Sequence, residues 1–236
     1  GYIAHDSLHA DVLTRDATGK EMYRLGANAT AAGETYTFRL KPNLILNYKL
    51  WTVDPANEIF YAAQGFYVNK FNLSYLQSGI GIQSEKTEAA SPINIDINRF
   101  QISDITALLN QDTLLASGVL NAHAKLSDFN KTLPAFEGNV TIDSIRYRQT
   151  AVGNVSVKAS KIAEDKVSAE ATLGGNGNDV NVKGTYFLNQ PEQQFEALLG
   201  IKQLNMASIE GFLLGKISEA KGSINGDLTL SGKFSD

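Results

Sequence analysis

The feature that most constrains this chain is the alternation of apolar and polar side chains through residues 154–187. A period of two puts all apolar side chains of a strand on one face and all polar ones on the other. Three successive segments carry the pattern, and their apolar positions are Val155, Val157 and Ala159, then Val167, Ala169, Ala171 and Leu173, then Val180, Val182, Gly184 and Tyr186. The pattern therefore predicts three consecutive half-buried strands.

Short connectors over residues 161–166 and 174–178 separate these segments, as an antiparallel meander requires. Helical spacing occurs only near residues 104–110 and 205–216. Strand patterns also fill the first half of the chain, at residues 36–40, 44–50, 66–68, 71–76, 79–83 and 93–97. We predict a mainly β fold, in which an elongated, curved antiparallel sheet with solenoid-like repeats forms an open trough and carries two short helices.

An internal repeat links the two helical segments. Residues 104–109 match residues 205–210 at an offset of 205 − 104 = 101, and residues 118–127 match residues 222–231 at an offset of 222 − 118 = 104. We expect residues 1–35 to be a connector or strand segment and residues 36–236 to form one β domain. Its repeats would cover about 104–200 and 205–236, the second cut short, as in a piece excised from a longer array.

Composition removes several functional classes. The net charge is −4, with 21 Lys and Arg against 25 Asp and Glu, which argues against a nucleic-acid groove. The chain has no cysteine, so disulfides, thiolate nucleophiles and Cys-ligated metals are excluded. No run approaches the roughly 18 apolar residues of a membrane-spanning helix.

Candidate sites for catalysis or metal binding are weak. His5 and His9 have the spacing of zinc ligands on a helix, but the Glu of a zinc protease motif is missing. His123 lies on a strand without a Ser, Asp or Glu spaced to form a triad. Residues 174–179 fit a single calcium-binding nonapeptide, for which a hairpin turn is the simpler reading. We expect no catalytic residue, no metal, no cofactor and no enzyme.

The aromatic residues gather in the first 100 residues, which hold 13 of the 21 in the chain. They could form a ligand platform, although core packing and cross-strand pairing are the commoner uses of aromatics in strands.

The apolar face of the three alternating strands contains small side chains such as Ala159, Ala169 and Ala171. A trough lined by such a face could hold acyl chains, whereas a helix or second sheet covering it would make it an ordinary core; the pattern leaves both open. The residues expected to line the trough are Val155, Val157, Val167, Ala169, Ala171, Leu173, Val180 and Val182.

The segment 204–213 and the glycine-punctuated strand at 220–234 together resemble the C-terminal domain of the TamB family, the translocation and assembly module proteins related to AsmA. Residues 118–127 resemble a second copy, with Ala122 and Asp128 in place of glycines. Residues 44–51, 57–59 and 68–73 are similar to TamB proteins of Bacteroidota-like bacteria.

This resemblance implies a non-enzymatic periplasmic protein, anchored in the inner membrane by a helix that this piece lacks. It implies a partner barrel of the TamA or BamA type in the outer membrane, and a cargo of phospholipid or nascent outer-membrane protein. The alternative is a β-rich surface or adhesion module that binds glycan or protein through aromatics. Exposed aromatics on the polar parity would favour that module, an uncovered apolar face would favour the conduit, and a compact pocket around His123 or a carboxylate pair would favour a hydrolase.

Overall fold

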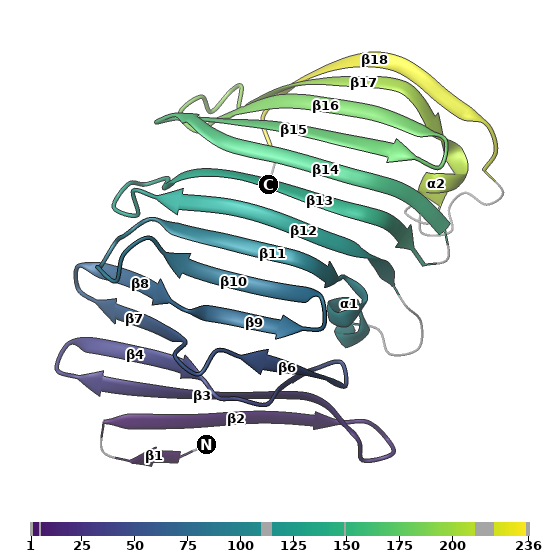
Figure 1. Cartoon of the computed structure of the whole chain (residues 1–236). Helices are drawn as coiled ribbons and strands as arrows, with labels where there is room; N and C mark the ends of the chain where they lie inside the picture. Colours follow the sequence, from purple (N-terminus) through teal and green to yellow (C-terminus); the bar gives the residue numbers. More distant parts are fainter. Residues whose placement is uncertain (1, 5, 110–114, 149, 211–219, 235–236) are drawn as a thin grey trace. The chain divides into compact units, whose positions relative to one another are not determined.

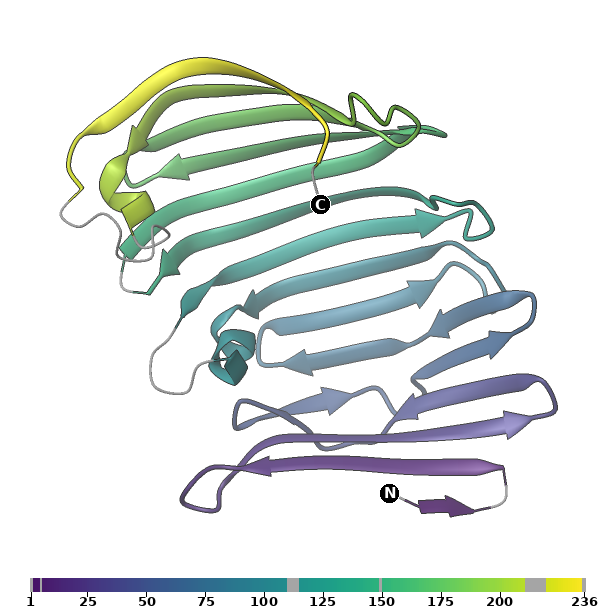
Figure 2. The ribbon, with the colours of Figure 1, turned by 180° about the vertical axis from the view of Figure 1, so that it is seen from behind.

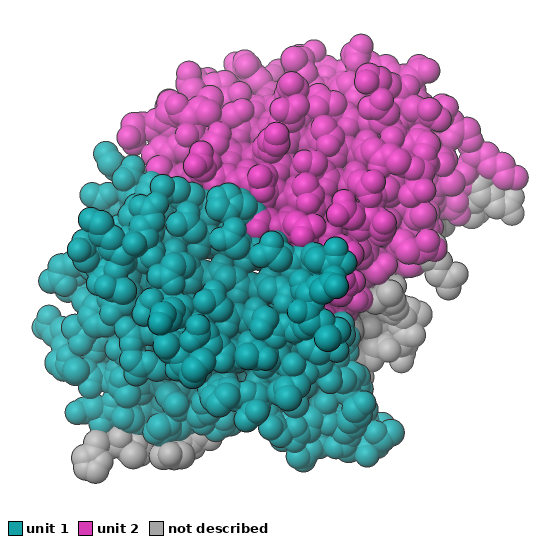
Figure 3. Space-filling view, in the orientation of Figure 1, with its two compact units in different colours: residues 1–100, 123–134 teal, residues 101–122, 135–236 magenta. Residues whose placement is uncertain are grey.

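The computed structural model describes residues 2–4, 6–109, 115–148, 150–210 and 220–234, and Figures 1 and 2 draw the ribbon from two sides. Its described part consists of strands with two short helices, which confirms the predicted mainly β fold class. The chain divides into two compact units, coloured teal and magenta in Figure 3. Unit 1 comprises Gly1–Phe100 and His123–Pro134, and unit 2 comprises Gln101–Ala122 and Ala135–Asp236.

Unit 1 is built almost entirely of short strands. In chain order these are β1 (Tyr2–Ala4), β2 (Ser7–Arg15), β3 (Glu21–Ala32), β4 (Thr35–Leu40), β5 (Leu44–Leu46), β6 (Lys49–Val53), β7 (Glu58–Ala62), β8 (Gly65–Asn69), β9 (Phe71–Tyr75), β10 (Ser78–Ser84) and β11 (Ile93–Gln101). Strand β12 (Ala116–Ser127) begins in unit 2 and ends in unit 1.

The sheet of unit 1 branches at β3. This strand pairs with β4 over Ala27–Ala32 and with β5 at Arg24, all antiparallel. One branch continues as β4–β7–β8 and the other as β5–β6–β9–β10–β11. Pro42 explains the switch between β4 and β5, because proline has no N–H to donate to a ladder and so ends the pairing of β4. Asn57 joins the branches, since its side chain bonds both to the backbone of Leu40 and to the carbonyl of Asp54.

The core of unit 1 comes from strands of both branches. Trp51 of β6 is 1% exposed, and its ring lies 6.0 Å from that of Tyr75 and 5.8 Å from that of Phe100. The buried apolar side chains of this unit are Leu44, Trp51, Val53, Ala62, Val68, Leu73, Ile93 and Phe100. This aromatic cluster is therefore core, as strand aromatics commonly are.

Unit 2 is built around an antiparallel meander, with one short helix before β12 and another before the last strand. Its elements, besides the start of β12, are α1 (Ser103–Leu109), β13 (Ala135–Tyr147), β14 (Thr150–Ala163), β15 (Lys166–Gly175), β16 (Asn178–Phe187), β17 (Phe195–Asn205), α2 (Met206–Glu210) and β18 (Ser223–Gly232). Each of β13 to β17 pairs with the next strand in the chain. Figures 1 and 2 show that these strands curve along their length.

The helices α1 and α2 connect to their neighbouring strands in the same way. In each case a backbone N–H near the helix start donates to a glycine carbonyl, and a helix side chain bonds to the backbone at or just before the start of the next strand. The pairs are Ile102 N to Gly118 O and Met206 N to Gly222 O, then Thr106 Oγ1 to Ala116 O and Ala220 N to Glu210 Oε2. A single offset, 206 − 102 = 222 − 118 = 104, relates these contacts, and it is the offset that relates residues 118–127 to residues 222–231 in the sequence.

Other differences from the sequence expectations are local. Residues 44–50 form two strands because Asn47 and Tyr48, both with positive φ, turn the chain between β5 and β6. The expected helix at 104–110 is described as far as Leu109, and the one at 205–216 as far as Glu210, so residues 110 and 211–216 lie outside the described residues.

Replacing Trp51 with alanine should lower the free energy of unfolding by about 3 to 5 kcal/mol, because it empties the centre of the unit 1 core. The matched control is Leu50→Ala on the same strand, where the side chain is 57% exposed and the expected change is below about 1 kcal/mol. Urea unfolding followed by circular dichroism measures both. Equal losses in the two variants would contradict this account of the core.

Candidate functional site

The register of β14, β15 and β16 brings the predicted lining residues onto one face. Val157 pairs with Ala171, which in turn pairs with Val182 on the next strand. The flanking pairs are Val155 with Leu173, Ala159 with Ala169, Leu173 with Val180, and Val167 with Tyr186. Residues that are opposite each other in a ladder point to the same side of the sheet. All eight predicted residues therefore share this side, which we call the apolar floor.

The apolar floor extends beyond the three predicted strands. Val140 of β13 pairs with Val157, Leu199 of β17 pairs with Val182, and Leu228 of β18 pairs with Leu199. These residues make one row across the strands, and parallel rows run on either side of it. In the sequence, the alternation of Leu199, Ile201, Leu228 and Leu230 with other residues was the signal for this extension.

Among the described residues, no second layer covers the middle of the apolar floor. Seven of the eight predicted residues are half-buried and Ala169 is exposed, so water reaches all of them. Within the described part of unit 2, Val152 is the one large apolar side chain that is buried. A sandwich core would have buried the floor residues fully. An open apolar face of this kind marks an interaction surface.

Helix α2 covers one end of the apolar floor. Asn178 lies two residues before Val180, and its buried amide nitrogen donates to Ser208 Oγ of α2 at 2.9 Å and to Val152 O at 2.7 Å. Its Oδ1 accepts the N–H of Asn205 at 2.8 Å. The helix packs against β14 and β17, at the strand ends opposite the loop between β16 and β17 (Figure 1).

Aromatic side chains lie at the other end of the apolar floor. The ring of Phe234 lies 5.0 Å from that of Phe195 and 6.0 Å from that of Tyr186. Tyr186 and Phe195 pair across β16 and β17 on the floor parity. Tyr186 is 38% and Phe234 is 63% exposed. We call these three residues the aromatic rim.

A depression of about 570 Å³ lies on the opposite, polar face of β15–β18. The polar residues that line it are Ser168, Glu170, Lys183, Thr185, Gln193, Glu196, Thr229 and Ser231. Lys183 Nζ lies 3.1 Å from Glu170 Oε1 and holds the pKa of Glu170 below its usual value. A twisted sheet is hollowed along one diagonal on each face, which explains a hollow on this side too. The depression therefore offers hydroxyls and an ion pair, beside the exposed side chain of Leu198.

Unit 1 has an uncovered apolar face that the sequence analysis did not assign. The register places Leu8, Ala29, Phe38 and Ile59 opposite one another on β2, β3, β4 and β7. The exposed members of this face are Leu8, Val12, Leu25, Tyr36, Phe38 and Tyr61. In the sequence, the alternation of Leu8, Ala10 and Val12 with other residues was the pattern that could have predicted this apolar face. Some aromatic residues of the first 100 positions therefore lie at the surface, and others lie in the core.

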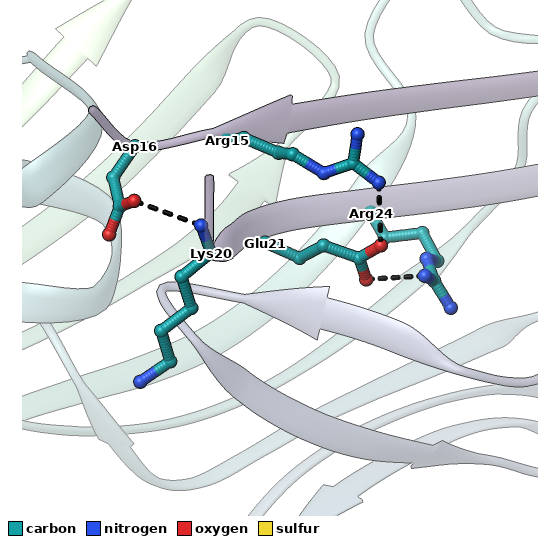
Figure 4. A network of polar contacts seen from close by, with 5 residues as sticks. All are labelled: Arg15, Asp16, Lys20, Glu21 and Arg24. Atoms are coloured by element: carbon teal, nitrogen blue, oxygen red, sulfur yellow. Dashed lines mark hydrogen bonds and ion pairs between the residues drawn. The ribbon is translucent and has the colours of Figure 1, made fainter. Parts of the chain in front are cut away.

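Charged side chains of unit 1 lie on the other parity or in its turns. Glu21 forms ion pairs with Arg15 at 3.3 Å and with Arg24, and both guanidinium groups lower its pKa (Figure 4). Asp16 accepts hydrogen bonds from Thr18, Tyr48 and the backbone of Lys20, which hold its pKa at about 2. These groups fix the β2–β3 hairpin.

The remaining sequence candidates take structural places. His9 contacts Asn28 Oδ1 at 2.7 Å, while His5 lies outside the described residues. His123 Nδ1 lies 2.8 Å from Asp96 Oδ1 on the surface. Residues 174–179 form the β15–β16 hairpin, with Asn176 and Gly177 at positive φ as expected. Among the described residues, no cluster of three His, Asp or Glu side chains could hold a metal ion.

Comparison with known proteins gives a match to a family model. The family model described as "TamB, N-terminal domain" matches residues 77–236, about two thirds of the chain. The resemblance to the family is confirmed, and the matched domain is the N-terminal one where the motifs had suggested the C-terminal one. No curated protein and no solved structure matches. Neither described helix is long and apolar enough to cross a bilayer.

Asn178→Ala should lower the free energy of unfolding by about 1 to 3 kcal/mol, because buried partners in β14, β17 and α2 lose their hydrogen bonds together. Asn225→Ala, at an exposed position of β18, is the control and should stay within about 0.5 kcal/mol of the parent. Chemical unfolding measures both. If the two variants were equally stable, Asn178 would not hold α2 on the floor.

Proposed function

Because the chain belongs to the TamB family, we propose that it is a section of a periplasmic conduit whose apolar floor shields the acyl chains of phospholipids between the two membranes. Members of this family are non-enzymatic transport components that work with TamA-type proteins of the outer membrane. The cargo, the groove and the residues that line it are our proposal for this chain.

The uncovered apolar floor of unit 2 is the observation that carries the proposal. Val157, Ala171, Val182 and Leu199 form a continuous apolar row that water reaches. Exposing such a surface costs free energy in roughly constant proportion to its area, at about 25 cal/mol per Å². An acyl chain laid on the floor removes that cost and is itself removed from water.

The floor suits an acyl chain better than an unfolded polypeptide strand. The N–H and C=O groups of the inner strands β14–β17 are engaged in the ladders on both sides. The predicted lining residues carry no side-chain donor or acceptor. A polypeptide lying there would leave its own backbone groups unpaired, at roughly 1 to 3 kcal/mol for each buried group. Hydrocarbon has no such groups.

The wider setting of the proposal follows from the family. We place the chain in the periplasm, as part of a longer protein anchored in the inner membrane, with an outer-membrane barrel of the TamA or BamA type as its partner. Nascent outer-membrane protein is the second cargo that this setting allows.

The alternative of a glycan-binding or adhesion module has less support. That function requires exposed aromatic side chains on the polar face of the strands. Among the described strand residues, the exposed aromatics Tyr36, Phe38 and Tyr61 share the apolar parity of unit 1, while Phe60 and Tyr67 stack together on the polar parity and are half-buried. Aromatic exposure therefore follows the apolar faces.

Lipid extracted from the purified protein, after expression with access to the periplasm, tests the proposal by mass spectrometry. The parent should carry phospholipid. The double variant Val157→Asp with Ala169→Asp should retain about tenfold less or lower still, because each carboxylate would have to lie against hydrocarbon.

The control places the same two charges one residue away. Ser156→Asp with Ser168→Asp puts them on the polar face of the same strands and should keep the lipid. Circular dichroism confirms that both variants are folded. Equal lipid in all three proteins, or none in the parent, would overturn the lipid conduit. A nascent barrel protein captured by the parent and lost only from the first variant would support polypeptide cargo.

A further inference from the structure

The two ends of the apolar floor differ in structure, which gives the floor a direction. At one end α2 lies over the strands, and Val152, Asn178 and Ser208 are buried beneath it. At the other end no helix lies over the described residues, and the side chains of the aromatic rim, Tyr186 and Phe234 above all, reach into solvent. One end is therefore closed and the other open.

The buried amide of Asn178 at the closed end is already paired. The amide of Asn178 bonds to Val152 O, Ser208 Oγ and Asn205 N. Both N–H donors of this amide are thus engaged and do not bind a phosphate or glycerol oxygen. A lipid headgroup placed among them would lose its hydration without replacement, which is costly for a charged group.

The open end combines aromatic rings with lysines. The ammonium group of Lys166 lies 5.7 Å from the ring centroid of Phe187, and that of Lys233 lies 3.2 Å from Glu192. Both lysines belong to the same ends of the strands as the aromatic rim. Amphipathic aromatic rings and lysines are the side chains that meet the headgroup level of a bilayer. Lys166 and Phe187 lie on the polar parity and Lys233 pairs with Glu192, so on the floor side it is the aromatic rim that would meet the headgroup, which stays in water.

The floor between its two ends has the length of an acyl chain. On β16, Asn178 and Tyr186 are eight residues apart, which corresponds to about 27 Å in an extended strand. Acyl chains in one leaflet of a bilayer span about 15 Å, half of the hydrocarbon core. A chain can thus lie along the strands between the aromatic rim and α2.

From these features we infer that a phospholipid on unit 2 is oriented, with its acyl ends directed toward α2 and its headgroup at the aromatic rim. This inference rests on the proposed function, since it specifies how the lipid lies on the same floor. Headgroups then stay in water at one side of the sheet while the tails are shielded. The closed side prevents the opposite orientation.

Photocrosslinking of the whole chain tests the orientation. Two phosphatidylethanolamine probes are used, one with a diazirine at the end of an acyl chain and one with the diazirine on the headgroup. The acyl probe should label peptides containing Val152 or Met206, and the headgroup probe should label peptides containing Phe195 or Phe234. Labelled sites are read by peptide mass spectrometry.

A double variant sharpens this test. Phe195→Ala with Phe234→Ala removes two rings of the rim and should reduce headgroup labelling there by about fivefold or more, whereas Phe187→Ala, on the polar parity, should not. Reversed labelling, or the same sites for both probes, would overturn the orientation while leaving lipid binding intact. Absence of lipid from the purified parent would instead overturn the proposed function, and the orientation with it.

Discussion

The backbone ladders of β13–β18 are the constraint on which unit 2 depends. Each inner strand pairs on both sides, so the polar backbone is satisfied without help from any other layer. The sheet can therefore persist while one of its faces stays uncovered. Strict alternation makes that face apolar and the other wet, as the pairing of Val157 with Ala171 and of Lys158 with Glu170 illustrates. Stability and an open apolar surface thus arise from the same ladders.

The two units obtain their stability differently. In unit 1 the sheet branches at β3, and strands from the two branches bury Trp51 and its neighbours in a core of the ordinary kind. In unit 2 the buried side chains of the described residues are few and include polar ones, Asp104, Thr106, Asn178 and Ser208, in or beside the helices. The hydrogen bonds of the helices, at equivalent positions 104 residues apart, provide local fixation where a core is missing.

Periodicity predicted the parts of this structure that depend on local pattern. The alternation at residues 154–187 was sufficient to predict three adjacent strands and the shared face of Val157, Ala171 and Val182. The hairpin at Asn176 and Gly177 followed from turn chemistry. Family membership came from the spacing of glycines and aliphatic residues and not from any single site.

What periodicity could not predict depends on long-range contacts. Alternation predicts that a face is apolar, but it does not predict whether another layer covers that face. Only the exposed fraction of each side chain in the folded chain shows this. The branch at β3 joins segments through the single pair of Arg24 with Ile45, and no local pattern signals such a pair. In the sequence, Asn178 belongs to a predicted turn. Its hydrogen bonds to Val152 O and to Ser208 Oγ of α2 join residues that are 26 and 30 positions away.

Cysteine labelling tests most directly whether the apolar floor is open and occupied by lipid. The chain has no native cysteine, so Val157→Cys and Val182→Cys on the floor can be compared with Ser156→Cys and Lys183→Cys on the polar face. We predict that, in delipidated protein, a maleimide modifies both pairs at similar rates, and that added phospholipid slows only the floor pair. Floor cysteines that stay unreactive in the folded, delipidated protein would mean that another layer covers this face, and would contradict the account.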